Sequence, residues 1–480
     1  MMRKTISGLS LLVILSIITG CVNNYPPPPS VLHADNYTSL TTDEQRMLPE
    51  SEKTFTLADA VSLGVANSPT FEKTSLRIQK AYNTFYGDLA NYLPTATASY
   101  GTSISQSHSK TKGNSWERTS KSNSSFMPTW DRSGSFDAGL NFTIFNGLQK
   151  EFDLLASYEN VIEKEQAMKW ARLSLINSIE NQYYGLVLAK EAININEQNL
   201  QFQEQMLDIV KEQYKNDLVT YDYVLNFEFN YKSEQVSLVG AKYNFKQLQF
   251  VLAALLGLTT AEFPENLILQ TPSDLLSRMQ KNFSTLGVEF YLDIAIDQRP
   301  DLEESRAKLK RARYDLYSAW GAFSPTLGAN ADYNNTSQQW LGGQPGDDRQ
   351  GFSYGLSASW DFLDAGFGRI FNVRDRQIEM DIKEQDVLLK WIDVVKTVRI
   401  AYLELQTSLI ESKLTSEAVS IAERQRDIVR EKFDNQLESI TRLNQVQTEL
   451  IAMQLTNVTS IISVYQSRVD LNTACGIQRY

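Results

Sequence analysis

The chain has 480 residues, and its 42% hydrophobic and 21% charged residues are close to the averages of globular proteins. This composition excludes a disordered chain and a polytopic helical membrane protein. The 57 acidic residues outnumber the 46 basic ones, which gives a net charge of -11. A nucleic acid is therefore not expected as a partner.

The chain is poor in the residues that most often perform catalysis or bind metals. It has two histidines, His33 and His108, and two cysteines, Cys21 and Cys475. So few residues offer no Cys/His cluster that could hold zinc, haem or an iron–sulfur centre, and two cysteines so far apart make a poor disulfide framework. Both histidines fall in segments with the composition of a tail or a loop, so neither is a good candidate for a general base. The sequence predicts no enzyme, no cofactor and no metal site.

Residues 1–20 have the layout of a bacterial lipoprotein signal peptide. Two basic residues precede an apolar run at 9–18, which is too short to remain in a bilayer as a spanning helix. The Ile-Thr-Gly-Cys sequence at 18–21 resembles the lipobox, in which the cysteine is acylated and becomes the mature N-terminus. We predict acylation of Cys21, rather than an ordinary signal peptide with a chance cysteine, because it directly follows the apolar core. Val22 follows it, where Asp would signal retention in the inner membrane, so the resemblance implies delivery to the outer membrane.

Residues 21–53 are predicted to form a lipidated tether. Four consecutive prolines at 26–29 favour an extended polyproline conformation over a packed element. No later stretch offers 18 consecutive apolar residues, so any membrane-spanning part of the mature chain would be a closed barrel of strands.

The body of the chain contains an internal duplication. Residues 55–69 align with 286–300, and 210–228 align with 429–447, with several landmarks in register. The predicted organisation is a first repeat at 54–258, a linker at 259–285, a second repeat at 286–477 and a tail at 478–480.

Two segments, 135–144 and 352–362, alternate strictly between apolar and polar residues, which predicts strands with one apolar face. Their weaker partners are 95–105 and 326–337. Each segment has about ten residues, enough to cross a hydrocarbon core when tilted. A hairpin packed on a helix would alternate in the same way, but the small, uncharged polar face favours a strand between water and lipid. The residues predicted to face lipid are Phe136, Leu140, Phe142, Ile144, Tyr354, Leu356, Trp360 and Phe362.

Four strands are too few to close a barrel, for which about eight is the practical minimum. Strands that span a membrane would therefore require several chains to share one barrel. Two copies would give eight strands and three would give twelve, and the residue pattern does not choose between them.

Two very long helices are predicted in regions without proline. Apolar residues with a three-four spacing indicate the seam of a coiled coil at 148–214 and again at 367–433. The other predicted helices are the return helices 221–256 and 440–474 and the shorter helices 70–92 and 301–323.

Together these features resemble the TolC-like outer-membrane factor family, and in particular its lipoprotein branch. The resemblance covers residues 55–477 and is most specific at the two helix-to-helix tips, 214–225 and 433–444. It implies a mainly α fold with a small β part, in which long antiparallel coiled-coil helices form a trimeric α-barrel. Four strands per chain would contribute to a shared 12-stranded β-barrel in the outer membrane. The implied partners are a periplasmic adaptor and an inner-membrane pump.

At the tips, the sequence departs from the family pattern. Asn216 and Asn435 are taken to stand in place of a tip glycine, since Asn tolerates left-handed backbone. Thr441 and Asn444 occupy positions where some members have paired aspartates, so a cation-binding carboxylate ring from the second copy is not expected. The residues predicted to form the gate and the adaptor contact are Asn216, Asp217, Asp222, Asn435, Glu438, Thr441, Arg442 and Asn444. Solvated charges at helix ends would explain the same residues equally well.

The sequence therefore predicts an outer-membrane exit duct for efflux or type I secretion, which is anchored by lipid, extends into the periplasm and performs no chemistry. The alternative is a lipid-anchored periplasmic coiled-coil scaffold without a pore. The transported substrate cannot be read from the sequence.

Overall fold

The computed structural model describes residues 54–107, 129–258, 268–269, 287–340, 347–360 and 366–477. Several predictions fall outside these residues: the signal peptide, Cys21, the tether, most of the linker, the tail, and the lipid-facing position Phe362.

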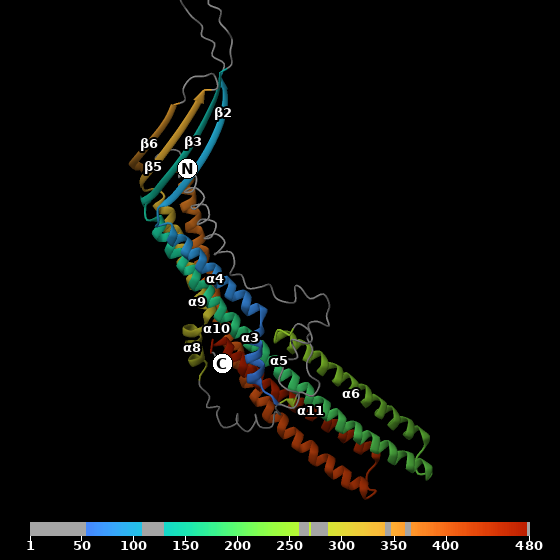
Figure 1. Cartoon of the computed structure of the whole chain (residues 1–480). Coiled ribbons are helices and arrows are strands. Elements are labelled where there is room, and N and C mark those ends of the chain that lie inside the picture. The colour runs from blue at the N-terminus through green and yellow to red at the C-terminus, as the bar shows by residue number, and fades with distance from the viewer. Residues whose placement is uncertain are drawn as a thin grey trace, which may run out of the picture. The chain divides into compact units, whose positions relative to one another are not determined.

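The elements follow one another in the same order twice, so the predicted duplication is confirmed (Figure 1). The first copy comprises α3 (Leu57–Asn67), α4 (Pro69–Ala90), β2 (Thr95–Ser107), β3 (Thr129–Phe145), α5 (Gln149–Lys215) and α6 (Tyr221–Leu255). The second comprises α8 (Val288–Gln298), α9 (Pro300–Gly321), β5 (Thr326–Trp340), β6 (Asp347–Ser359), α10 (Gly366–Asp434) and α11 (Ile440–Ala474). A short parallel pair joins β1 (Thr54–Phe55) to β4 (Ile268–Leu269).

All six predicted helices are present, and each begins and ends within two residues of its predicted bounds. The sequence analysis did not predict α3 and α8, which precede the two shorter helices. A capping box begins α3, because Thr56 accepts a hydrogen bond from the backbone N–H of Asp59 while the Asp59 carboxylate accepts from the backbone N–H of Thr56. This signal was available in the sequence.

The chain folds into two compact units, and each takes segments from both repeats. The first, which we call the tip unit, contains Met1–Ser68, Leu175–Phe283 and Ser408–Gln466. The second, the strand unit, contains Pro69–Ser174, Ser284–Thr407 and Ser467–Tyr480.

In the tip unit, apolar side chains of α5, α6, α10 and α11 pack together near the ends of the two helical hairpins. The buried members of this cluster are Met206, Leu207, Val210, Val224, Phe227, Val429, Ile440, Leu443 and Val446. The cluster fixes the ends of the hairpins, because these side chains lose their contact with water only when the four helices lie together.

In the strand unit, β2, β3, β5 and β6 form one antiparallel sheet in that order (Figure 1). The strands are longer than predicted, except that β6 ends at Ser359. Trp360 therefore lies beyond the strand, although the predicted strand 352–362 included it. Its indole N–H donates to the backbone oxygen of Phe323 at 3.1 Å.

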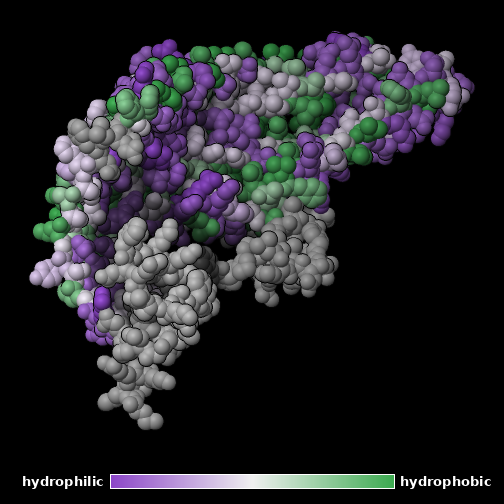
Figure 2. Space-filling model, turned by 90° about the horizontal axis from the view of Figure 1, so that it is seen from above, coloured by the Kyte–Doolittle hydropathy of each residue, from purple (hydrophilic) through white to green (hydrophobic). Residues whose placement is uncertain are grey.

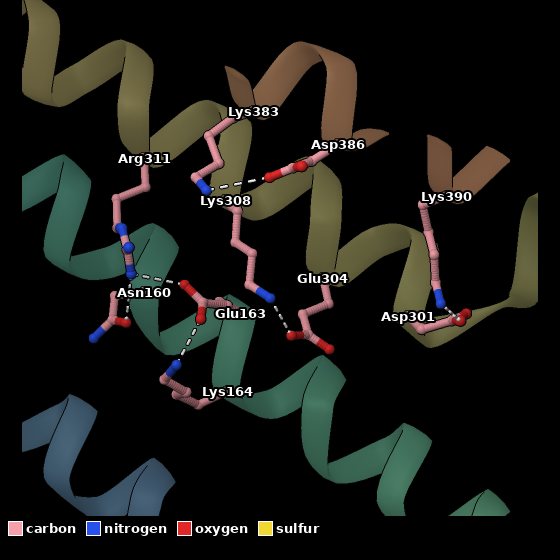
Figure 3. A network of polar contacts seen from close by, with 10 residues as sticks. All are labelled: Asn160, Glu163, Lys164, Asp301, Glu304, Lys308, Arg311, Lys383, Asp386 and Lys390. Carbon is pink, nitrogen blue, oxygen red and sulfur yellow. Dashed lines mark hydrogen bonds and ion pairs between the residues drawn. The ribbon is translucent and has the colours of Figure 1, made fainter. Parts of the chain in front are cut away.

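Charged side chains link α5 to α9 within the strand unit (Figure 3). The Glu163 carboxylate, whose side chain is 5% exposed, contacts Nη1 of Arg311 at 2.7 Å and Nζ of Lys164 at 2.5 Å. Arg311 also donates to Asn160 of α5 at 3.0 Å. The buried acid is thus neutralised from two sides, as a buried charge requires.

Among the described helices, none combines the length and the apolarity needed to cross a membrane. In the same residues, no group of three or more His, Cys, Asp or Glu side chains is arranged to hold a metal ion.

Candidate functional site

The turn between α5 and α6 ends the first helical hairpin of the tip unit. Asp217 has a φ of 60°, and its N–H donates to the oxygen of Tyr214 at 3.0 Å. The N–H of Leu218 donates to the oxygen of Gln213 at 2.9 Å. This pair of bonds is the Schellman motif, which satisfies carbonyl groups at the end of a helix.

The turn between α10 and α11 repeats the motif. Gln436 has a φ of 62°, and its N–H donates to the oxygen of Phe433 at 2.9 Å, while Leu437 donates to Lys432 at 2.8 Å. The left-handed residues are thus Asp217 and Gln436, so the prediction that Asn216 and Asn435 take this conformation was wrong by one position.

Both turns place a leucine on the surface. Leu218 is 72% exposed and Leu437 is 76% exposed, although the residue at this position of a Schellman motif usually packs against the helix. Sequence reasoning did not single out these leucines, but a leucine at the same place in both copies was a visible signal. The two turns line one cavity of about 740 Å³, whose walls include Asp217, Leu218, Thr220, Gln436 and Glu438.

The predicted gate residues are not joined to one another within one chain. Asp222 accepts a hydrogen bond from the hydroxyl of Thr220, and Nη1 of Arg442 donates to the side chain of Gln445 at 2.8 Å. The side chain of Asn435 donates to the backbone oxygen of Glu431 at 2.9 Å.

Asn444 faces the interior of the tip unit. Its side-chain oxygen accepts a hydrogen bond from Gln203 of α5 at 2.9 Å. Of the eight predicted gate residues, the structure brings Asp217 and Glu438 to the same cavity, while Asn216, Asn435 and Thr441 are exposed.

The sheet of the strand unit has two chemically different faces. Predicted lipid-facing residues, including Leu140 and Leu356, lie on one face, where they are exposed in the single chain. Phe136 on the same face packs edge-on against Tyr333, with ring centroids 6.4 Å apart. The opposite face carries Ser, Thr, Asn and Gly at nearly every position.

The sheet also has two open edges. β2 and β6, each of 13 residues, pair along one side only in the described chain. The backbone N–H and C=O groups of their outer sides can therefore form a ladder with another strand.

Comparison with known proteins agrees with this architecture. The sequence model of the outer membrane efflux protein family matches residues 61–258 and 291–477. The chain therefore belongs to the outer membrane efflux protein family. It is 20% identical over 329 residues to a protein of Pseudomonas putida KT2440 described as the probable efflux pump outer membrane protein TtgC. That match covers 64% of this chain and 63% of the relative, which is less than two thirds of its length.

Solved structures of outer-membrane channels share the fold. CusC superposes with a TM-score of 0.72 at 18% identity, over 88% of this chain and 92% of that chain. The CmeC outer membrane channel of Campylobacter jejuni gives a TM-score of 0.71 at 18% identity, over 90% of this chain and 87% of that one. The predicted fold class, mainly helical with four antiparallel strands, is confirmed.

Proposed function

We propose that this chain is the outer-membrane exit duct of a tripartite efflux pump or a type I secretion system. Three copies would share one 12-stranded barrel, continued by a tunnel of helices, and substrates would pass through without chemistry. The duct would be anchored through acylated Cys21, extend into the periplasm and meet a periplasmic adaptor and an inner-membrane pump at its helical tips.

The observation that carries this proposal is the sheet, which has one apolar face, one polar face and two open edges. Because strand directions alternate from β2 to β6, the β6 edge of one copy is antiparallel to the β2 edge of another. Copies added edge to edge would remove every open edge only when the sheet closes. The closed sheet would then present its apolar face to lipid and its polar face to water.

An exposed apolar seam on α10 gives independent support for self-association. Its residues follow the three-four spacing of a coiled coil over most of the helix, yet they are exposed in the single chain. They are Phe371, Ile378, Ile382, Leu389, Ile392, Ile400, Leu403, Ile410, Leu414, Ile421 and Ile428. On the face seen in Figure 2, apolar surface is interspersed with hydrophilic surface.

The experiment that tests the proposal is native mass spectrometry of the mature protein extracted from membranes in detergent, followed by planar-bilayer recording of the same sample. Three acylated copies that conduct ions are expected. A monomer that stays in solution without detergent after its lipid is removed, and that does not conduct, would instead establish the scaffold.

We further propose that polar contacts of Glu438 and Arg442 with neighbouring copies hold the tip closed. Glu438 lies in the turn before α11 and Arg442 in the first turn of α11, and within one chain neither forms an ion pair among the described residues. Replacing both by Ala should increase the passive entry of large antibiotics into cells. The control is Gln445→Ala, which removes the partner of Arg442 within the chain. Equal entry in wild type and in the double variant would contradict this role.

A further inference from the structure

Two aspartates lie on the polar face of the sheet, in neighbouring cross-strand rows. Asp137 of β3 is opposite Asn334 of β5, and in the next row Asp332 of β5 is opposite Gly139 of β3. Among the described side chains of this face, the other charged residue is Arg349 of β6, in the row on the far side of Asp137.

Both carboxylates are held by amide groups of β5. The side-chain nitrogen of Asn334 donates to Oδ1 of Asp137 at 2.5 Å, and that of Asn330 donates to Oδ2 of Asp332 at 2.6 Å. Asp is depleted in strands because it fits poorly on a pleated surface, so a carboxylate needs specific support there. The two acids are therefore held in position rather than loosely solvated.

Gly139 provides the space for one of these carboxylates. A β-carbon at this position would lie 2.6 Å from Oδ1 of Asp332 and 3.2 Å from the hydroxyl oxygen of Thr97. Any larger residue would force Asp332 to move. The sheet thus accommodates a negative charge in this row.

We propose that Asp137 and Asp332 give the strand-enclosed part of the duct a preference for cations. This inference rests on the proposed function, because it needs the polar face to line water. In three copies the described side chains of this face would carry six carboxylates and three guanidinium groups, and the strand register places Asp131 and Asp347 on the same face, so negative charge is in excess. Rings of acidic side chains favour cations in a pore, because their potential extends over about 8 Å at physiological ionic strength.

The test is voltage-clamp recording of the full mature protein in planar bilayers, with the trivalent cation spermidine added to one compartment at a time. Spermidine should block the wild type from the strand side. Asp137→Asn and Asp332→Asn should each raise the half-blocking concentration, and the double variant should raise it about fivefold or more. The matched control is Asp348→Asn, because Asp348 is an exposed acid of β6 on the apolar face of the same sheet.

The outcomes separate the two proposals. If no variant and no wild-type sample conducts, the proposed function fails. If all conduct and the half-blocking concentration is the same in the double variant as in the wild type, the duct stands and the role of the two aspartates is overturned. An equal shift in Asp348→Asn would also overturn it, because the effect would then not depend on the polar face.

Discussion

At the scale of single residues, the least exposed ion pair among the described residues lies where α8 meets α9. Nε of Arg299 is 2.8 Å from Oδ1 of Asp301, and Nζ of Lys390 is 2.7 Å from Oδ2. Arg299 also donates to the backbone oxygen of Ala474 at 3.2 Å and lies 4.9 Å from the ring centre of Trp170. One carboxylate thus balances two cations and ties α9 to α10, while Arg299 bonds to the end of α11.

Asp301→Ala should destabilise the protein strongly. It leaves Arg299 without its acid and removes the nearer acid of Lys390, and breaking a buried pair in this way costs about 3 to 5 kcal/mol. Glu303→Ala is the matched control, because Glu303 lies on the same helix in a partly exposed pair with Arg306, for which a loss below about 1 kcal/mol is expected. Denaturant titration of the detergent-extracted protein measures both, and equal losses would contradict the assignment.

Burial raises the pKa of the Cys475 thiol to about 12, although Arg299 opposes the shift. The unfolded thiol loses its proton near pH 9 and the folded one near pH 12, so the unfolded chain binds fewer protons between these values. The free energy of unfolding should therefore fall as pH rises above 9. At pH 8 iodoacetamide should leave Cys475 unmodified in the folded protein and modify it in guanidinium chloride, as mass spectrometry of its peptide would show. Rapid modification of the folded protein would contradict this burial.

The left-handed tip residues show where residue preference fails as a guide. The sequence favoured Asn216 and Asn435 because Asn tolerates this conformation, yet the structure uses Asp217 and Gln436. Gln has no special tolerance for left-handed backbone. The packing of the buried cluster near the tips determines where each helix ends, and the turn's hydrogen bonds then impose the conformation on whichever residue follows.

At the scale of elements, the period-two pattern predicted the strands and their faces, but not their ends. β3 begins at Thr129, before the alternation starts, since backbone pairing with β2 and β5 continues there. β6 ends before Trp360, whose indole bonds to Phe323, a contact that no strand pattern contains. Strand pairing depends on partners that are distant in sequence. A local sequence pattern therefore predicts the type of an element better than its length.

The two faces of β3 can be distinguished by adding the same charge to each. Leu140→Arg should cost about 2 to 4 kcal/mol if its face meets lipid near the bilayer centre. Asn141→Arg, one residue further on the opposite face, should cost much less. Urea unfolding of the protein in lipid vesicles gives both values. A small cost at Leu140, no larger than that at Asn141, would favour the scaffold.

At the scale of the whole molecule, the α10 seam should determine the number of copies that associate. Leu414→Glu with Ile421→Glu places charges toward the C-terminal end of the exposed seam and should shift the mature protein from the proposed trimer to monomer in native mass spectrometry, because burying unpaired carboxylates is costly. Ser416→Glu, on the same helix outside the seam, should leave the trimer in place. A trimer that survives the double change would contradict the role of the seam.

The copy number itself is the part that one chain's sequence could not predict. Eight or twelve strands would both satisfy the open edges of β2 and β6, since backbone hydrogen bonding is the same in either ring. The duplication and the helices were local or pairwise patterns and could be read directly. The curvature of a shared barrel is a property of the assembly.

The paired tip turns would also affect the stoichiometry with which the proposed adaptor binds. Each chain presents two Schellman turns of the same geometry, each with an exposed leucine. A partner that recognises this shared feature would have two equivalent binding sites on each chain. A partner that recognises Asp222, which is present in the first repeat alone, would have one binding site on each chain. The number of adaptor molecules bound per chain would therefore show what the adaptor recognises. Two would indicate the feature that both turns share, and one would indicate a residue that differs between the two repeats.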